Sequence, residues 1–392
     1  MLAPPRRFAD DLYPLRRGRL ERREFITRTQ LLRDAIARTL FAPTSLSKAI
    51  ERLGFLQADP IRAPARAQDL ILRHRVKDYR AGDLERRYAS LAIEEDYLVN
   101  YGFLPREHVS LMHPRTSRRP WTKQHKTRAQ AILEFIEQRG EVHPDDVEEH
   151  FAHGRVKNAW GGMSRASTAL LDLMHYRGLL RIARRDNGIR VYALPRSTPI
   201  ELSEEERARR LLHLALSLYG PVPARSLGTL ASFLRLGAPH LRPHLRAMLT
   251  KLKKELPCEE LDGVTWYWPH DDGPNLEADP HEQVRFLAPF DPLVWDRRRF
   301  EFLWGWAYRF EAYTPIAKRV RGYYALPLLW REEVIGWANV NATNTELGYV
   351  IGSAPKEKAY KRELEAELTR LQEFLQTESN PRNSEGLPSS RP

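Results

Sequence analysis

A series of amphipathic helices followed by a tight β-hairpin, between residues 127 and 194, limits the folds open to this chain. Residues 127–139 carry apolar side chains at helical spacing, and Gly140 follows as a stop signal. Asp186-Asn187-Gly188 joins two short β-rich runs, which is a strong hairpin signal. The expected elements are helices over 127–139, from Pro144 and from Ser164 to 178, then strands over 179–183 and 189–194. Three helices and a hairpin in this order predict a winged helix.

The segments on either side show looser versions of the same order. Downstream, helices are expected over 204–219 and 241–256, followed by a hairpin that turns at Asp262-Gly263. Upstream, helices are expected over 27–40 and 45–53, followed by an irregular stretch at 54–60. Units that repeat in this way usually stack as an array, so three tandem winged helices are expected.

The last third of the chain has a different character. Aromatic residues and turn signals crowd residues 284–352, with strands expected over 323–330 and 334–340 and a helix over 356–376. The sequence therefore predicts an α+β fold: three tandem winged-helix modules, a small β-rich C-terminal domain whose core the aromatic rings fill, and a terminal helix. The expected boundaries are an N-terminal extension 1–26, winged helices 27–126, 127–199 and 200–280, a β-rich domain with its closing helix 281–376, and a disordered tail 377–392.

Charge and composition narrow the function. The formal net charge is +12, which favours a polyanionic partner, although scattered solvated residues could also account for it. An apolar run long enough to span a membrane is absent, and the first residues do not resemble a signal peptide. Cys258 is the single cysteine, and we find no glycine-rich phosphate loop. We expect a cytoplasmic, nucleoid-associated protein that binds DNA and needs no metal or cofactor.

The sequence Gln57-Ala58-Asp59-Pro60 is the strongest candidate for chemistry. Pro60 disfavours helical geometry at Asp59, and side chains two apart in an extended segment share a face. An amide and a carboxylate side by side can hold one water, whose proton the carboxylate accepts. The competing interpretation is structural, with Asp59 as the N-cap of a helix that begins at Pro60.

Several motifs resemble the YcaQ/AlkZ-like crosslink-repair DNA glycosylases, a winged-helix family. The resemblance covers residues 27–375. The matching motifs are Leu53-Gly54-Phe55-Leu56-Gln57-Ala58-Asp59, Arg66-Ala67-Gln68-Asp69-Leu70-Ile71-Leu72 with Arg75, Arg177-Gly178-Leu179-Leu180, Val191-Tyr192-Ala193-Leu194-Pro195, Leu287-Ala288-Pro289-Phe290-Asp291-Pro292-Leu293-Val294-Trp295-Asp296-Arg297, Glu311-Ala312-Tyr313-Thr314-Pro315, Lys318-Arg319 and Gly322-Tyr323-Tyr324-Ala325-Leu326-Pro327. The resemblance implies that Gln57 and Asp59 are the catalytic pair.

The chain departs from the family pattern at three positions. In the stretch 95–105, Val99 stands where a histidine is frequent and Tyr97 stands in place of a tryptophan. Gln68 stands where a histidine often follows Arg66-Ala67. These departures leave open a changed substrate range, or a family member that binds damaged DNA without excising a base.

The expected function is a monomeric, monofunctional DNA glycosylase acting on alkylated purines in double-stranded DNA, of the N7-alkylguanine kind and including interstrand crosslinks. The main alternative is a non-catalytic winged-helix DNA-binding protein or transcriptional regulator, which would generally dimerise. The expected DNA contacts are Arg62, Arg66, Arg75, Ser164, Arg165, Arg184, Arg185 and Arg190.

Overall fold

A computed structural model describes residues 26–116, 120–157, 161–196, 200–269, 273–275, 282–342, 347–352 and 357–376. The predicted N-terminal extension lies almost entirely outside these residues, and the predicted tail 377–392 lies wholly outside them. Among the helices that are described, none combines the length and the apolar character needed to cross a membrane.

The first segment begins with the two expected helices. Thr27 and Ser45 cap α1 (Arg28–Thr39) and α2 (Leu46–Leu53), because each side chain accepts a hydrogen bond from the first turn. Further elements of this segment are β1 (Leu56–Gln57), α3 (Ala67–Leu72), α4 (Asp83–Arg87), η1 (Tyr88–Ser90), β2 (Ile93–Tyr97), β3 (Tyr101–Pro105) and α5 (Arg106–Met112). The β2–β3 hairpin was not predicted, because β2 consists largely of acidic residues that the fold nevertheless buries.

The second segment confirms most of the predicted helices and the hairpin. It contains α6 (Lys123–Arg139), β4 (Glu141–Val142), α7 (Pro144–Phe151), α8 (Ala166–Tyr176), β7 (Arg181–Asp186) and β8 (Ile189–Ala193). Asn187 and Gly188 have φ values of 48° and 86°, the left-handed conformation that a two-residue hairpin turn needs.

One predicted boundary in this segment is wrong. The helix expected from Ser164 begins only at Ala166, because Ser164 belongs to β6 (Met163–Arg165), which pairs with β5 (Arg155–Lys157). Backbone pairing between these two short strands keeps Arg165 extended, and the helix starts only after it.

The third segment follows its predicted order, with one additional α-helix and two short elements, β9 and η2. It contains α9 (Glu204–Tyr219), β9 (Val222–Pro223), α10 (Ala224–Gly237), η2 (Pro239–Leu241), α11 (Arg242–Glu255), β10 (Cys258–Leu261) and β11 (Val264–Tyr267). The additional helix is α10, which buries Leu227, Leu230 and Leu234 at helical spacing. The sequence shows this periodicity, but the helix was not predicted, because Gly220-Pro221 just before it indicated irregular structure.

The C-terminal part is an antiparallel sheet of order β12-β13-β14-β15 with helices beside it. Its elements are β12 (Val284–Phe286), α12 (Arg297–Trp304), η3 (Ile316–Lys318), β13 (Leu326–Trp330), β14 (Glu333–Ala342), β15 (Leu347–Gly352) and α13 (Glu357–Leu375). The aromatic core is confirmed for Tyr308 and Tyr324, but Tyr313 and Tyr323 are exposed, contrary to expectation. Both belong to the irregular stretch before β13, outside the sheet.

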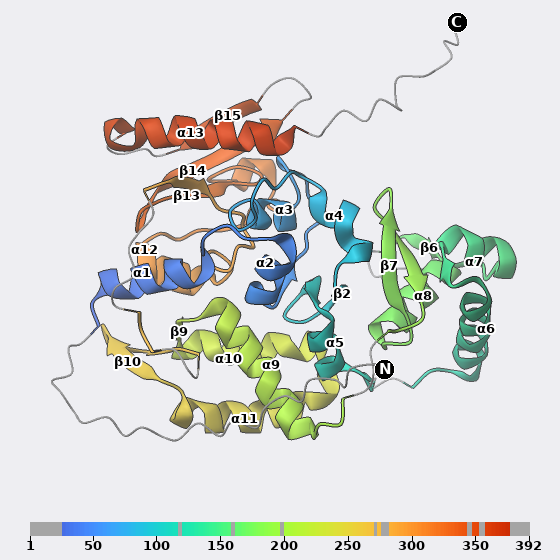
Figure 1. The fold of residues 1–392 in the computed structure, drawn as a ribbon. Coiled ribbons are helices and arrows are strands. Elements are labelled where there is room, and N and C mark those ends of the chain that lie inside the picture. The colour runs from blue at the N-terminus through green and yellow to red at the C-terminus, as the bar shows by residue number, and fades with distance from the viewer. Residues whose placement is uncertain are drawn as a thin grey trace, which may run out of the picture.

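The first segment occupies the middle of the molecule, with the C-terminal sheet on one side and the third segment on the other (Figure 1). The second segment lies at one flank, where β7 approaches β2 (Figure 1). A single cluster of buried apolar residues runs from Phe41 to Phe374 and joins all four parts. The candidate catalytic stretch therefore sits where the parts of the fold converge.

Candidate active site

The stretch from Leu56 to Pro60 is extended rather than helical. Gln57 pairs with Gly102 of β3, and the Ala58 N–H donates to the Tyr101 carbonyl at 3.0 Å. Gly102 permits this approach, since a Cβ there would lie 2.3 Å from the Leu56 carbonyl oxygen. The extended backbone predicted at this position is confirmed.

Asp59 does not cap a helix. Its Oδ1 accepts the Ile61 N–H at 2.9 Å, and this hydrogen bond closes a local turn. The side chain therefore stabilises a turn and not the start of a helix. The next helix starts only at Ala67. No other hydrogen bond to this carboxylate is found among the described residues, so the greater part of its acceptor capacity is not used by the turn.

Both members of the candidate pair are largely buried. Burial raises the pKa of the Asp59 carboxyl above its ordinary value, and the Ile61 N–H only partly opposes this rise. The Gln57 Oε1 atom is buried and lacks a hydrogen-bond partner within the described parts of the chain. A buried acceptor without a partner is uncommon in folded proteins and is typical of sites that bind water or a ligand.

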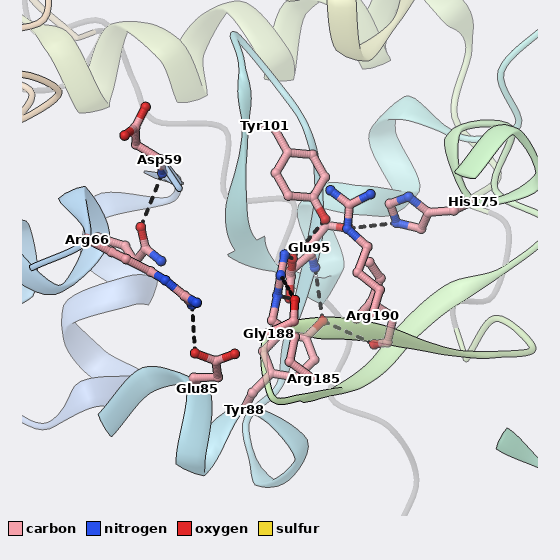
Figure 2. Close-up of polar contacts among 12 residues, drawn as sticks. Asp59, Arg66, Glu85, Tyr88, Glu95, Tyr101, His175, Arg185, Gly188 and Arg190 are labelled. Atoms are coloured by element: carbon pink, nitrogen blue, oxygen red, sulfur yellow. Dashed lines mark hydrogen bonds and ion pairs between the residues drawn. The ribbon is translucent and has the colours of Figure 1, made fainter. Parts of the chain in front are cut away.

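Gln68 on α3 holds the backbone of this stretch. Its Oε1 accepts the Asp59 N–H at 3.2 Å. The Asp59 carboxylate points away from the neighbouring Arg66–Glu85 ion pair (Figure 2). Gln68 was noted in the sequence only as a departure from the family pattern. The structure gives it a positioning contact with the main chain of the candidate base.

Tyr324 is a buried tyrosine that the sequence did not single out. Burial raises the pKa of its phenol well above the ordinary value, and the charge of Asp59 raises it further. Its Oη is buried and has no hydrogen-bond partner among the residues described. The only signal in the sequence was its membership of the motif Gly322-Tyr323-Tyr324.

Two predicted DNA contacts on the β7–β8 hairpin are instead engaged within the protein. Arg185 donates to both carboxylate oxygens of Glu95, at 2.8 and 2.5 Å, and Tyr101 donates to the same carboxylate (Figure 2). Arg190 pairs with Asp172 at 2.7 Å and lies over the Tyr101 ring. These contacts fasten the hairpin to the β2–β3 hairpin of the first segment.

Glu95 and Asp96 are neighbours on β2 and point to opposite faces, as residues of a strand must. Asp96 pairs with Arg115 at 2.8 Å and with His113 at 2.6 Å. Burial alone would raise the pKa of Asp96, but the charge of Arg115 and the His113 contacts hold it well below the ordinary value. Two adjacent carboxylates thus serve two separate internal ion pairs.

Arg75, one of the predicted DNA contacts, is buried inside the protein. Its side chain and that of Asp291 are both 0% exposed, and they form a two-point ion pair at 2.9 and 3.1 Å. Arg66 is half-buried and pairs with Glu85 at 2.7 Å. Neither side chain could have been recognised as an internal partner from sequence spacing.

Other predicted DNA contacts lie at the surface. Arg62 is exposed and Ser164 is half-buried. Arg165 and Arg184 are about half exposed, and they pair with Asp145 and Glu141 respectively. Exposed ion pairs of this kind are weak, so both guanidinium groups can exchange a carboxylate for a phosphate. Within the described ranges, no cluster of His, Cys, Asp or Glu has the make-up of a metal site.

Comparison with known proteins agrees with the resemblance. The family model described as DNA glycosylase AlkZ-like matches residues 50–374. The solved structure of Streptomyces sahachiroi DNA glycosylase AlkZ superposes with a TM-score of 0.60 at 16% identity, over 89% of this chain and 97% of that one. At that identity the superposition establishes a similar fold, and the family match extends over most of the sequence. The chain belongs to the AlkZ-like family of DNA glycosylases.

Proposed function

We propose that this glycosylase hydrolyses the N-glycosidic bond of alkylated purines in double-stranded DNA, with Asp59 and Gln57 as the catalytic pair. The observation that carries the proposal is an ionisable, largely buried carboxylate on an extended segment, two residues after a buried amide oxygen without a partner. Substrates of the N7-alkylguanine kind suit so small a set of groups.

The chemistry follows from the charge of such a base. A purine alkylated at N7 is cationic, so the glycosidic electron pair passes to the base without prior protonation and the base leaves neutral. The sugar acquires oxocarbenium character at C1′, which the Asp59 carboxylate opposes electrostatically. Water held by Gln57 attacks C1′ and transfers a proton to Asp59. No lysine adjoins the pair in sequence, so we propose hydrolysis without strand cleavage.

Burial supports this division of roles. Burial raises the pKa of the Asp59 carboxyl, so its carboxylate is a stronger base than one in water. The same burial strengthens the attraction of the carboxylate to positive charge. The Ile61 N–H and Gln68 hold the Asp59 residue in place while leaving carboxylate acceptor capacity for water.

We also propose that the three helix-and-hairpin segments act as winged-helix modules of a monomer that binds DNA, with boundaries at 27–126, 127–199 and 200–280. Arg62, Arg165 and Arg184 are the exposed candidates for phosphate contacts. Interstrand crosslinks are included among the proposed substrates. A base tied to both strands cannot be flipped freely, so C1′ must be approached from outside the base stack.

The test is release of N7-methylguanine from a defined duplex under single-turnover conditions. Asp59→Asn should reduce the rate by more than about tenfold, because removal of a general base typically costs ~10²–10⁴-fold. Asp262→Asn, which changes an exposed carboxyl at the turn of the β10–β11 hairpin, is the matched control and should excise at the wild-type rate. A smaller effect at Asp59 would reject the assignment. Absence of any base release, combined with sequence-specific binding by a dimer, would favour a regulator.

A further inference from the structure

An unusual concentration of exposed apolar side chains lies between α12 and β13. Tyr313, Ile316 and Val320 are 79%, 80% and 75% exposed, and Tyr323 is also exposed. Four large apolar residues within one short irregular stretch, here named the 312–323 loop, differ from the isolated exposed hydrophobics that are ordinary on protein surfaces.

The loop is held rigidly although it is exposed. The Glu311 carboxylate accepts the backbone N–H groups of Val320, Arg321 and Gly322 at 2.7–3.3 Å, which draws the two ends of the loop together. Across the loop, the Arg319 Nε donates to the Thr314 carbonyl at 2.8 Å. The apolar side chains are therefore presented by an ordered backbone, which lowers the entropic cost of binding.

The charge of the loop identifies the kind of partner. Residues 312–323 contain Lys318, Arg319 and Arg321 and no acidic residue. Lys318 is exposed beside the apolar side chains, and Glu311 at the base of the loop is buried by its backbone contacts. Apolar side chains surrounded by positive charge fit DNA, whose stacked bases are apolar and whose backbone is anionic.

The position of the loop relates it to the reacting centre. It leads directly into Tyr324, a buried phenol whose pKa the charge of Asp59 helps to raise. Phe310, just before the loop, packs against the rings of both Tyr313 and Tyr324, at centroid distances of 6.0 and 5.4 Å. The loop is therefore joined, through Tyr324 and Phe310, to the part of the fold that faces the candidate site.

We propose that the 312–323 loop is a wedge that presses Ile316 and Val320 against base pairs beside the lesion and unstacks them, while Lys318 pairs with a phosphate. This inference rests on the proposed function, since the wedge sets the position of the duplex relative to Asp59. Apolar wedges that disturb base steps are a general device of proteins that bend DNA.

The experiment measures binding to an undamaged duplex and the fluorescence of 2-aminopurine placed beside a lesion. The double variant Ile316→Ser/Val320→Ser should bind about tenfold more weakly and lose the fluorescence rise that accompanies unstacking. Val350→Ser, which changes a 70%-exposed valine on β15, is the matched control and should behave as the wild type. Lys318→Gln should reduce the slope of log affinity against log salt by about one.

Failure of the wedge and failure of the glycosylase proposal are distinguishable. Asp59→Asn should slow excision by more than about tenfold but keep wild-type affinity and the 2-aminopurine signal. The wedge is overturned if the double variant matches Val350→Ser in both measurements, or if it changes only the oligomeric state. Normal excision by Asp59→Asn would overturn the catalytic assignment and leave the wedge measurements intact.

Discussion

Asp59 combines two properties that usually exclude each other, an ionisable side chain and a largely desolvated position. Burial raises the pKa of its carboxyl, so the protonated form persists to a higher pH than in an exposed aspartate. The base must be ionised to accept a proton. The excision rate should therefore fall as pH decreases through this raised pKa, giving an acid limb above the usual range of aspartate.

A pH–rate profile under single-turnover conditions tests this expectation. The acid limb should disappear in the residual activity of Asp59→Asn. The folded state holds the Asp59 proton more tightly than the unfolded chain does. Folding stability should therefore fall as pH rises from the ordinary pKa of aspartate to the raised pKa, and should stay at the lower value above it. Asp59→Asn should then be no less stable than the wild type at neutral pH, and a large loss of stability would contradict the desolvation argument.

Tyr324 supplies a second prediction at the residue scale. Tyr324→Phe removes only a buried hydroxyl that has no partner among the described residues, so stability should not fall. Excision should slow by about tenfold if this hydroxyl binds the sugar or the water in the transition state. Tyr308→Phe offers the contrast, because that hydroxyl donates to the Ala325 carbonyl and its loss should cost ~1 kcal/mol of stability. Unchanged excision by Tyr324→Phe would remove this residue from the site.

The residue scale also marks the limit of sequence inference. The extended backbone at Gln57 and Asp59 was predictable because Pro60 constrains it, whereas their catalytic roles were implied only by the family resemblance and stay a proposal. Arg75 was misassigned because composition cannot distinguish a surface guanidinium from one that a distant carboxylate buries. Tyr324 was missed because its relation to Asp59 depends on tertiary structure rather than spacing.

The β7–β8 hairpin illustrates how an element can be predicted while its partner is not. Its turn was evident from Asn187-Gly188, because asparagine and glycine adopt the left-handed backbone of a two-residue turn more readily than other residues. Its docking on the first segment depends on Glu95, which lies in a strand that the sequence did not predict. A run of acidic residues is typical of a solvent-exposed segment. The fold can bury this one because Arg185 pairs with Glu95 and Arg115 pairs with Asp96.

Removing Arg185 should therefore weaken the fold more than DNA binding. Arg185→Gln leaves the buried Glu95 carboxylate without its cation, and loss of one member of a buried pair costs about 3–5 kcal/mol. Arg184→Gln, on the same strand but 47% exposed, should change stability by less than ~1 kcal/mol. Urea unfolding of both variants measures the difference. Equal effects would show that Arg185 does not fasten the hairpin.

At the scale of the whole molecule, the order of the segments was predictable but their mutual packing was not. Helical periodicity and turn signals define local elements, whereas the buried pair of Arg75 and Asp291 joins the first segment to the C-terminal part. The same holds for the apolar cluster that spans the four parts. Such contacts have no signature in a single sequence.

The Arg75–Asp291 pair leads to a prediction about the intact protein. Arg75→Gln should lower the free energy of unfolding by about 3–5 kcal/mol without changing the salt dependence of DNA binding by the folded protein. Arg62→Gln should show the reverse, with unchanged stability and a salt slope reduced by about one. A reduced salt slope for Arg75→Gln would restore it as a phosphate contact.

The electrostatic interaction of Asp59 with Tyr324 also has a consequence for biosynthesis. Ribosomes deliver the amino-terminal residues first, and domains generally fold in that order. A nascent polypeptide that has reached only the third segment already carries the carboxylate but lacks the surface that encloses it. On the proposal that Asp59 is the catalytic base, we expect translation to pass Tyr324 before this chain can excise a base.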